Sequence, residues 1–275
     1  MGRNCLSTLK PIYCSVLVGT PTFLAAIGTA AHEQQLQSLR MVFTGAEKCP
    51  ESTYQLLVGR CPQATICEGY GVTECAPLVS VNPPQNPVRG TIGRVMPSME
   101  YKLLHPETLQ PLSEDEPGLL VVRGPNVFSG YLEDDVMPPF IRLDNKEWYN
   151  TGDLVRRNEH GGLTFCGRLQ RFVNLGGEMI SLPAIEETLA AALELDDVSY
   201  SGGALIAIEA KNRDTHPELV LFSCVPLDHE RVNSLIRAAG LSPLHHIRQI
   251  RRVDEMPVLG TGKVDYLALR EMLAS

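Results

Sequence analysis

The sequence predicts a mixed fold, in which an α/β portion is followed by a small β-rich portion and then by an α+β domain. Near the start, two short apolar runs at 12–18 and 40–44 are each followed by turn residues and a helix-like stretch. This alternation is typical of a sheet with mostly parallel strands. Further along, strand candidates at 99–104, 118–123 and 162–166 are separated only by turn-rich segments, which favours a small barrel-like or distorted sheet.

The last part of the chain has a different pattern. Ser181 precedes a stretch in which apolar residues recur every four positions, so we expect a helix to begin there. Strand candidates follow at 204–209 and 219–225, and a second helix is expected between its N-cap Asp228 and its stop at Gly240. Strands and helices mixed in this way predict a separate α+β domain.

The composition is that of an ordinary globular protein. Among its 275 residues, 44% are hydrophobic and 20% are charged, which argues against a disordered or fibrous chain. The formal net charge of −8 argues against nucleic acid as the main partner, because phosphate binding favours a basic surface. The cysteines contain no repeated C-x-x-C and the histidines complete no metal-ligand set, so we expect free thiols in a reducing cytosol.

The N-terminal segment leaves one alternative open. Residues 11–31 carry no charge and end in small side chains, as a secretory signal does. The break at Gly19, Thr20 and Pro21 instead favours a strand, a turn and a helix, and it argues against a membrane span. We therefore expect a cytoplasmic protein, and association with the periphery of the inner membrane stays open.

Four short motifs stand in order along the chain. Taken alone, each has an ordinary explanation as a strand end, a turn, a surface arginine or a solvated loop. The last motif is not a Walker phosphate loop, because Val264 stands where Ser or Thr is required. The motifs are EGYGVTE at 68–74, YNTGD at 149–153, GR at 167–168 followed by GGE at 176–178, and GTGK at 260–263.

In this order and at these separations the motifs resemble one family, the adenylate-forming superfamily of acyl-CoA synthetases, firefly-type luciferases and non-ribosomal peptide adenylation domains. The phrases FTGAEKCPES, RGPNVFSGYL, GRLQRFVNLGGEMISL and MPVLGTGKVDY look most like bacterial acyl-[acyl-carrier-protein] synthetases, the ligase half of the 2-acylglycerophosphoethanolamine acyltransferase system. The resemblance runs from about residue 12 to the end and implies the C-terminal half of that fold, truncated at the N-terminus.

This resemblance also implies a division of the chain. The proline-rich stretch 83–87 supports the first boundary as a linker. The implied parts are a remnant of the large α/β subdomain at 1–85, a β-rich subdomain at 86–168, a hinge at 169–171 and a mobile α+β domain at 172–275.

A nucleotide site for ATP or AMP is implied in the first two parts. Tyr70 would present a flat aromatic face to the adenine. Asp153 would accept hydrogen bonds from both ribose hydroxyls, and Arg168 would make a second ribose contact. The residues implied to bind the nucleotide are Gly45, Ala46, Glu47, Tyr70, Gly71, Asp153 and Arg168.

Three residues are implied to take part in catalysis. Thr73 matches a hydroxyl that contacts the α-phosphate, and Glu74 matches the carboxylate that holds Mg²⁺. Lys263 matches the lysine that bridges the substrate carboxylate and the α-phosphate and stabilises charge in the transition state. The implied first reaction joins a fatty acid to AMP and releases pyrophosphate from ATP.

A second reaction is implied for the mobile domain. A phosphopantetheine thiol, carried by acyl carrier protein or coenzyme A, takes the acyl group and releases AMP. The domain would swing about Gln170 between the two reactions, after which Gly176, Gly177 and Glu178 would line the thiol tunnel. Gln170 departs from the family, in which the hinge residue is usually Asp or Lys.

One expected part is absent from the sequence. Family members hold the triphosphate with a Ser/Thr/Gly-rich loop that ends in Pro-Lys-Gly, and the 275 residues contain no such loop. A fragment of a longer protein, a shortened or split gene product and a remnant with another role all stay open, as do a missing N-terminal half and a fused acyltransferase. We expect an acyl ligase or part of one, and the alternative is a non-catalytic module that binds nucleotide or carrier protein.

Acyl carrier protein is the expected thiol partner. Segment 231–252 contains no acidic residue although the chain is acidic overall, and carrier proteins are strongly acidic beside their pantetheine group. The alternative is a solvated rim of arginines whose stems cover apolar surface. The predicted docking residues are Arg231, Arg237, Arg248, Arg251 and Arg252.

Overall fold

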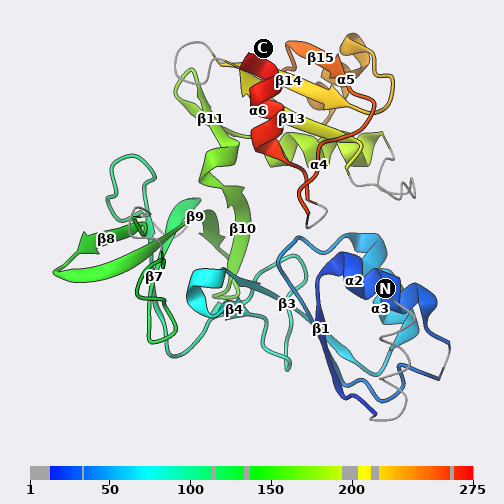
Figure 1. The fold of residues 1–275 in the computed structure, drawn as a ribbon, viewed down its shortest axis with the longest axis vertical. Helices are drawn as coiled ribbons and strands as arrows, with labels where there is room; N and C mark the ends of the chain where they lie inside the picture. Colours follow the sequence, from blue (N-terminus) through cyan, green and yellow to red (C-terminus); the bar gives the residue numbers. More distant parts are fainter. Residues whose placement is uncertain are drawn as a thin grey trace. The chain divides into compact units, whose positions relative to one another are not determined.

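The computed structural model describes residues 13–32, 34–112, 116–132, 137–193, 204–211, 217–260 and 263–274. The chain divides into two compact units, Met1–Cys166 and Gly167–Ser275, and Figure 1 traces both in sequence order. The division lies just before the predicted hinge at 169–171. No helix in the described ranges is long and apolar enough to cross a membrane.

Three parallel strands and two connecting helices open the first unit: β1 (Val16–Gly19), α2 (Pro21–Ala30), β2 (Met41–Thr44), α3 (Glu51–Arg60) and β3 (Thr65–Gly71). Leu17, Val42 and Ile66 pair in register as one row across the sheet, and this row shares a core with both helices. The side chain of Thr20 accepts a hydrogen bond from the Phe23 amide and so caps α2. The two apolar runs predicted as parallel strands are confirmed, although β1 begins only at Val16.

The next strands pair antiparallel: β4 (Leu78–Val81), β5 (Arg94–Val95), β6 (Glu100–Leu104), β7 (Gly118–Arg123), β8 (Phe140–Leu143) and β9 (Lys146–Arg157). β10 (Leu163–Arg168) follows and ends in the second unit. β4 and β5 extend the first sheet, whereas the others form a second sheet in the order β10-β9-β7-β6, with β8 on β9. Tyr70 and Val79 of the first sheet share a core with Leu120 and Tyr149 of the second. This common core brings β3 and β9 together.

The boundary predicted at 85–86 falls inside the first sheet. β4 pairs antiparallel with β5, and the proline-rich stretch is the loop that joins them. The loop is held by the Asn82 side chain, which accepts a hydrogen bond from the Val88 amide at 2.9 Å and donates one to the Thr91 carbonyl at 2.9 Å. The prolines therefore mark a loop within one unit.

The second unit comprises the hairpin β11 (Phe172–Leu175) and β12 (Glu178–Ser181), then α4 (Leu182–Ala192), β13 (Ile206–Lys211), β14 (Glu218–Ser223), α5 (His229–Ala238), β15 (Gln249–Arg252) and α6 (Tyr266–Ala274). β14 pairs antiparallel with β13 and parallel with β15. Ile208 and Leu221 share a core with α4 and α5, whereas Ala207 and Phe222 share another with α6. Helices thus cover both faces of this sheet, as Figure 1 shows.

Candidate functional site

The carboxyl ends of β2 and β3 place several predicted residues at one edge of the sheet. The two strands are parallel neighbours paired as far as Thr44 and Glu68, so the segment 45–47 and Tyr70 both lie just beyond that last pair. Ligands of open α/β sheets usually bind at this edge. Glycine is required directly after β2, because a Cβ atom on Gly45 would lie 2.9 Å from the Gly69 carbonyl oxygen. Ala46 then turns the backbone with a φ of 68°.

Gly71 stands at a bulge at the end of β3. The pairing of β3 with β4 shifts register between Tyr70 and Gly71. A Cβ atom on Gly71 would lie 2.0 Å from the Pro77 carbonyl oxygen, so no other residue fits without moving the backbone. The short helix η1 (Thr73–Cys75) follows at once and carries the predicted catalytic residues Thr73 and Glu74.

Tyr70 and Asp153 are in direct contact. The Tyr70 hydroxyl donates a hydrogen bond to Oδ2 of Asp153, and the Tyr70 ring lies against Phe165, with 5.9 Å between ring centroids. Asp153 is fully buried and Tyr70 is 9% exposed. The structure therefore brings together the residues expected at the adenine and at the ribose, with the carboxylate closed against the Tyr70 hydroxyl.

A bulge in β9 directs Asp153 inward. Leu119 pairs with Leu154 and Val121 with Asn150, so residues 151–153 of β9 lie opposite Leu120 alone. Gly152 adopts a φ of 70°, and the Asn150 side chain accepts a hydrogen bond from its amide at 2.9 Å. The TGD motif at 151–153 is thus a turn within a strand, which is the ordinary explanation that the sequence also allowed. This turn positions the carboxylate of Asp153.

Two tyrosines flank Glu74. The Tyr131 hydroxyl donates to Oε1 of Glu74 at 2.9 Å, and this hydrogen bond raises the pKa of Tyr131. Burial raises the pKa of Tyr149, and the Glu74 carboxylate raises it further. Phe128 packs edge-on against both tyrosine rings and donates its amide to the Glu74 carbonyl at 2.8 Å. Sequence reasoning missed Tyr131 as a partner of Glu74, although it lies within the quoted phrase RGPNVFSGYL.

The surroundings of Glu74 fit a magnesium ion that accompanies phosphates. Among the described residues no group of three or more His, Cys, Asp or Glu side chains could hold a metal by itself. Mg²⁺ commonly takes one or two carboxylates and completes its shell with water and phosphate oxygens. Glu74 offers one such carboxylate, and Thr73 beside it is exposed.

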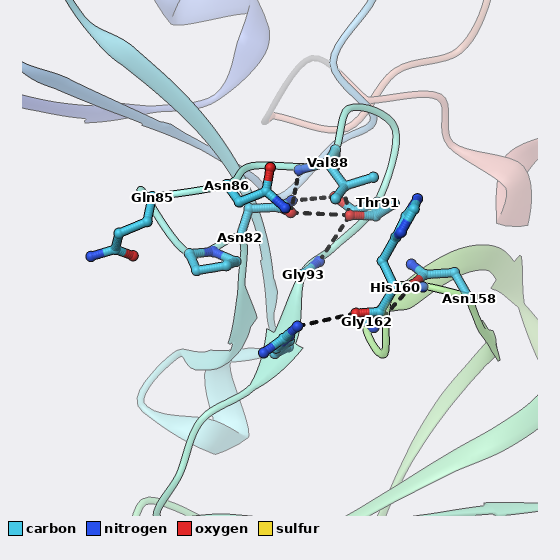
Figure 2. A pocket seen from close by; sticks show the side chains of 11 residues that line it. Asn82, Gln85, Asn86, Val88, Thr91, Gly93, Asn158, His160 and Gly162 are labelled. Atoms are coloured by element: carbon cyan, nitrogen blue, oxygen red, sulfur yellow. Dashed lines mark hydrogen bonds between the residues drawn. The ribbon is translucent and has the colours of Figure 1, made fainter.

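Two cavities are found among the described residues of the first unit, and the second of them lies beside Glu74. The one in Figure 2, of about 240 Å³, is lined by the loop around Asn82 and by Asn158, His160 and Gly162. Its polar groups bond mostly to one another, since Gly162 donates to Asn158 and Arg94 donates to the His160 carbonyl. No residue predicted to bind nucleotide lines it. A wider cavity of about 700 Å³ is lined in part by the aromatic side chains Phe128, Phe140 and Tyr149.

Lys263 stands near the end of a closed loop of the second unit. The Leu259 amide donates to the Lys263 carbonyl at 2.7 Å, and the Asp265 amide donates to the Pro257 carbonyl at 2.8 Å. Lys263 itself is exposed. The Asp265 side chain accepts hydrogen bonds from the first amides of α6, so the loop runs directly into that helix. Thr261 and Gly262 of the motif lie outside the described residues.

The residues predicted for the hinge and the thiol tunnel also lie in the second unit. Gly176 and Gly177 form the turn between β11 and β12 with φ values of 63° and 89°, which glycine adopts most easily. Glu178 follows, exposed, as the first residue of β12. Gln170 lies in η2 (Leu169–Arg171), and the exposed Arg168 precedes it at the end of β10. Arg168 therefore belongs to a different unit from Tyr70 and Asp153.

The five predicted docking arginines do not share one face. Arg251 pairs in register with Phe222 on the α6 side of the sheet, and its guanidinium donates to the Met272 carbonyl near the end of α6. Arg252, the next residue on the strand, points to the opposite side. Arg251 therefore does not share a face with Arg252, because strand alternation separates neighbouring side chains, and the predicted docking surface stays a proposal.

A smaller group of basic residues does gather beside α5. Burial lowers the pKa of His246, and the positive charges of Arg237, Arg248, His229 and His245 lower it further. The Asn233 side chain of α5 bonds both backbone groups of Ile247, so the neighbouring residues His246 and Arg248 are held beside this helix. We refer to the five residues His229, Arg237, His245, His246 and Arg248 as the basic cluster.

Comparison with known protein families finds a match to the part of the chain that contains β2, β3 and Glu74. A profile of the AMP-binding enzyme family matches residues 3–132, which include β2, β3, Glu74 and Tyr131. Residues 3–132 are therefore similar to the AMP-binding enzyme family. The coarser resemblance, to adenylate-forming enzymes, is confirmed, and the finer one to acyl-carrier-protein synthetases stays a proposal.

Several curated relatives of the chain are named as ligases. The chain is 27% identical over 287 residues to 4-coumarate-CoA ligase 2 of Narcissus pseudonarcissus, which covers 99% of this chain and 48% of the relative. It is also 27% identical over 266 residues to L-allo-isoleucine:holo-[CmaA peptidyl-carrier protein] ligase of Pseudomonas savastanoi pv. glycinea, over 94% of this chain and 43% of that ligase. The chain thus spans about half the length of the curated relatives it matches.

The likeness to solved structures shows the fold. ATP-bound MatB from Rhodopseudomonas palustris is 22% identical with a TM-score of 0.76, and the match covers 99% of this chain and 53% of that one. The predicted fold class, a partial adenylate-forming fold, is confirmed.

Proposed function

We propose that the chain is the part of an AMP-forming ligase that activates a fatty acid and passes it to a phosphopantetheine thiol. The contact between Tyr70 and Asp153 carries this proposal, because it assembles the residues expected at adenine and ribose from two different sheets. A family match that spans β2, β3 and Glu74 supports it. Relatives named as ligases of coenzyme A and of a peptidyl-carrier protein support a thiol acceptor.

The first step is adenylation. An oxygen of the fatty acid carboxylate attacks the α-phosphorus of ATP, and the bond from that phosphorus to pyrophosphate breaks. Lys263 is assigned to stabilise the negative charge that develops between the carboxylate and the α-phosphate. Glu74 is assigned to hold the Mg²⁺ that neutralises the departing pyrophosphate, and Thr73 to contact the α-phosphate.

The second step is thiol transfer. The sulfur of phosphopantetheine attacks the acyl carbonyl carbon, the bond to AMP breaks, and the thiol proton passes to solvent. Gly176, Gly177 and Glu178 are assigned to the path of the thiol, because their hairpin turn lies in the second unit with the hinge residue Gln170. Rotation about Gln170 would exchange this turn for the Lys263 loop between the two steps.

Acyl carrier protein is proposed as the thiol donor. The exposed arginines of the basic cluster, Arg237 and Arg248, offer an acidic carrier positive charge on a chain whose formal net charge is −8. Opposite charges of this kind increase the rate of encounter and orient the partners. Arg231 and Arg252 are exposed residues of the same segment and remain in the proposed surface.

The proposal is tested with the full-length gene product. Fatty acid, ATP and Mg²⁺ are expected to yield pyrophosphate and acyl-AMP, and added carrier protein is expected to yield an acyl thioester and AMP. Asp153→Ala should raise the KM for ATP, whereas Asp144→Ala, which removes an exposed carboxylate paired with Lys102, should leave it unchanged. Pyrophosphate release that is absent, or is the same in all three proteins, would contradict the proposal.

A binding module without catalysis is the second candidate. The burial of Asp153 favours the form of this candidate that binds carrier protein, because a carboxylate closed against Tyr70 does not offer itself to a ribose. This candidate requires that the full-length gene product bind AMP or carrier protein but release no pyrophosphate from ATP with any fatty acid.

A further inference from the structure

A buried ionic network in the second unit has no part in the proposed chemistry. It joins η2, which contains the hinge residue, to α4, β13 and α6. Two guanidinium groups and two carboxylates meet there, and the charges lie close enough to pair. Buried charges are costly unless each is paired and hydrogen-bonded, so a network of this size constrains the segments that contribute to it.

Arg171 is the centre of the network. Its Nη1 donates to the Ile208 carbonyl of β13 at 2.7 Å, and its Nη2 donates to Oε1 of Glu186 in α4 at 2.6 Å. Its guanidinium carbon lies 3.5 Å from the centroid of the Tyr266 ring. Arg171 is only 7% exposed, so these contacts are shielded from water.

The carboxylates connect the remaining segments. Glu186 accepts hydrogen bonds from the Ile208 amide at 2.6 Å and from the Tyr266 hydroxyl at 3.2 Å. The fully buried Glu209 accepts from Nε of Arg270 in α6 at 2.7 Å. Arg270 also donates to the carbonyl of the hinge residue Gln170, at 3.4 Å. The helix α6 therefore contacts the hinge twice, through the Tyr266 ring and through Arg270.

The same helix is joined to the Lys263 loop. Tyr266 is its first residue and follows Lys263 by three positions. Asp265 caps the helix with its side chain and closes the loop with its amide, through a hydrogen bond to the Pro257 carbonyl at 2.8 Å. Only Val264 and the hydrogen-bonded Asp265 separate Lys263 from α6 on this side of the loop.

We propose that Arg171 and Tyr266 are positioning residues that make the hinge segment and the Lys263 loop move as one rigid body. A rotation at the hinge then rotates Lys263 with it. Arg171 and Tyr266 act in this way without touching the substrate. The role of Lys263 in this inference rests on the proposed function, whereas the mechanical coupling does not.

Two substitutions probe the coupling. Arg171→Lys keeps the charge but removes the planar fork that reaches Ile208 and Glu186 and stacks on Tyr266. Tyr266→Phe keeps the ring under the guanidinium and removes only the hydroxyl. We therefore expect a large effect of the first and a small effect of the second. Arg123→Lys, at an exposed ion pair with Glu100 in the first unit, is the matched control.

Amide hydrogen exchange of the 275-residue chain is the first measurement. Arg171→Lys is expected to speed exchange about tenfold both in the hinge peptide and in the peptide covering the Lys263 loop, with a lesser increase for Tyr266→Phe. The control Arg123→Lys should leave the exchange of both peptides unchanged. Faster exchange in the hinge alone, or throughout the second unit equally, would overturn the proposal, because the first shows no coupling and the second shows general destabilisation.

Half-reactions of the full-length gene product are the second measurement. Arg171→Lys is expected to lower the kcat of acyl-AMP formation about tenfold with little change in the KM for ATP, because Lys263 is misplaced while the nucleotide site is intact. Transfer from supplied acyl-AMP should be retained. If both half-reactions fell equally, positioning of Lys263 would be refuted. If the unsubstituted protein formed no acyl-AMP, the proposed function would fail, and the exchange result would still decide the coupling.

Discussion

The hydroxyl of Tyr70 donates a hydrogen bond to the buried Asp153 carboxylate, and the two residues are 83 positions apart in the sequence. One belongs to a strand of the first sheet and the other to a bulge in the second. Their contact joins the two sheets at the place where the nucleotide is proposed to bind. Tyr70 therefore has two roles, one in the fold and one in the proposed site.

Tyr70→Phe tests the structural role. The substitution keeps the ring but removes a donor to a buried carboxylate, which should cost about 1–3 kcal/mol of the free energy of unfolding. The one tryptophan, Trp148, is buried in the first unit, so its fluorescence in urea follows this transition. Tyr13→Phe, at a tyrosine 77% exposed, is the control and should change stability little. Equal stability of all three proteins would show that the hydrogen bond does not stabilise the fold.

Asp153→Ala tests the ribose assignment. AMP or a non-hydrolysable acyl-AMP analogue is expected to bind the chain weakly, and removal of the carboxylate should weaken binding about tenfold or more, because a charged acceptor of two hydroxyls is lost. Titration calorimetry measures both affinities. Adenosine analogues without ribose hydroxyls should bind the two proteins equally. If AMP also bound both equally, the ribose would lie elsewhere.

Lys263→Ala is expected to separate the two half-reactions. In the full-length gene product, formation of acyl-AMP should fall at least about a hundredfold, because the developing charge loses its cation. Transfer from supplied acyl-AMP should persist, since the lysine acts only in the first step. Measuring pyrophosphate release and thioester formation separately gives both rates. A parallel loss of both would contradict the assignment of Lys263 to adenylation alone.

Charge reversal tests the carrier surface. The double variant Arg237→Glu and Arg248→Glu should lower activity with acyl carrier protein, leave activity with coenzyme A unchanged, and flatten the dependence on salt. Arg40→Glu with Arg142→Glu makes the same change in net charge on exposed arginines of the first unit. If both double variants behaved alike, net charge and not the basic cluster would explain the effect. Equal losses with both acceptors would point to folding or to the thiol path.

Gly71→Ala tests the backbone of the site. A Cβ atom there meets the Pro77 carbonyl oxygen at 2.0 Å, so we expect a loss of about 2 kcal/mol or more in the free energy of unfolding. Gly59 in α3 offers the opposite case, because its Cβ would meet nothing within 4 Å. Gly59→Ala should stabilise the chain by about 0.5–1 kcal/mol. Urea unfolding followed at Trp148 compares them, and a neutral Gly71→Ala would show that the bulge can move.

The sequence by itself determined the features that depend on neighbouring residues. The order of the motifs indicated the family, the apolar runs gave the parallel strands, and Ser181 and Asp228 were correctly predicted as helix caps. Each of these signals acts within a few residues, so a linear reading detects it. The prolines at 83–87 were predicted as a linker between subdomains, because their neighbours did not reveal that the strands on both sides pair.

Only the tertiary structure decided which distant side chains meet. Neither the pairing of Tyr70 with Asp153 nor that of Tyr131 with Glu74 has a local signature. Asn233 was missed for the same reason: it is buried within α5 because its amide bonds both backbone groups of Ile247. In the sequence alone, Arg171 has the features of a surface charge. In the structure it is buried among β13, α4 and α6. Burial and partnership arise from packing between segments, and a sequence read in one dimension does not contain those distances.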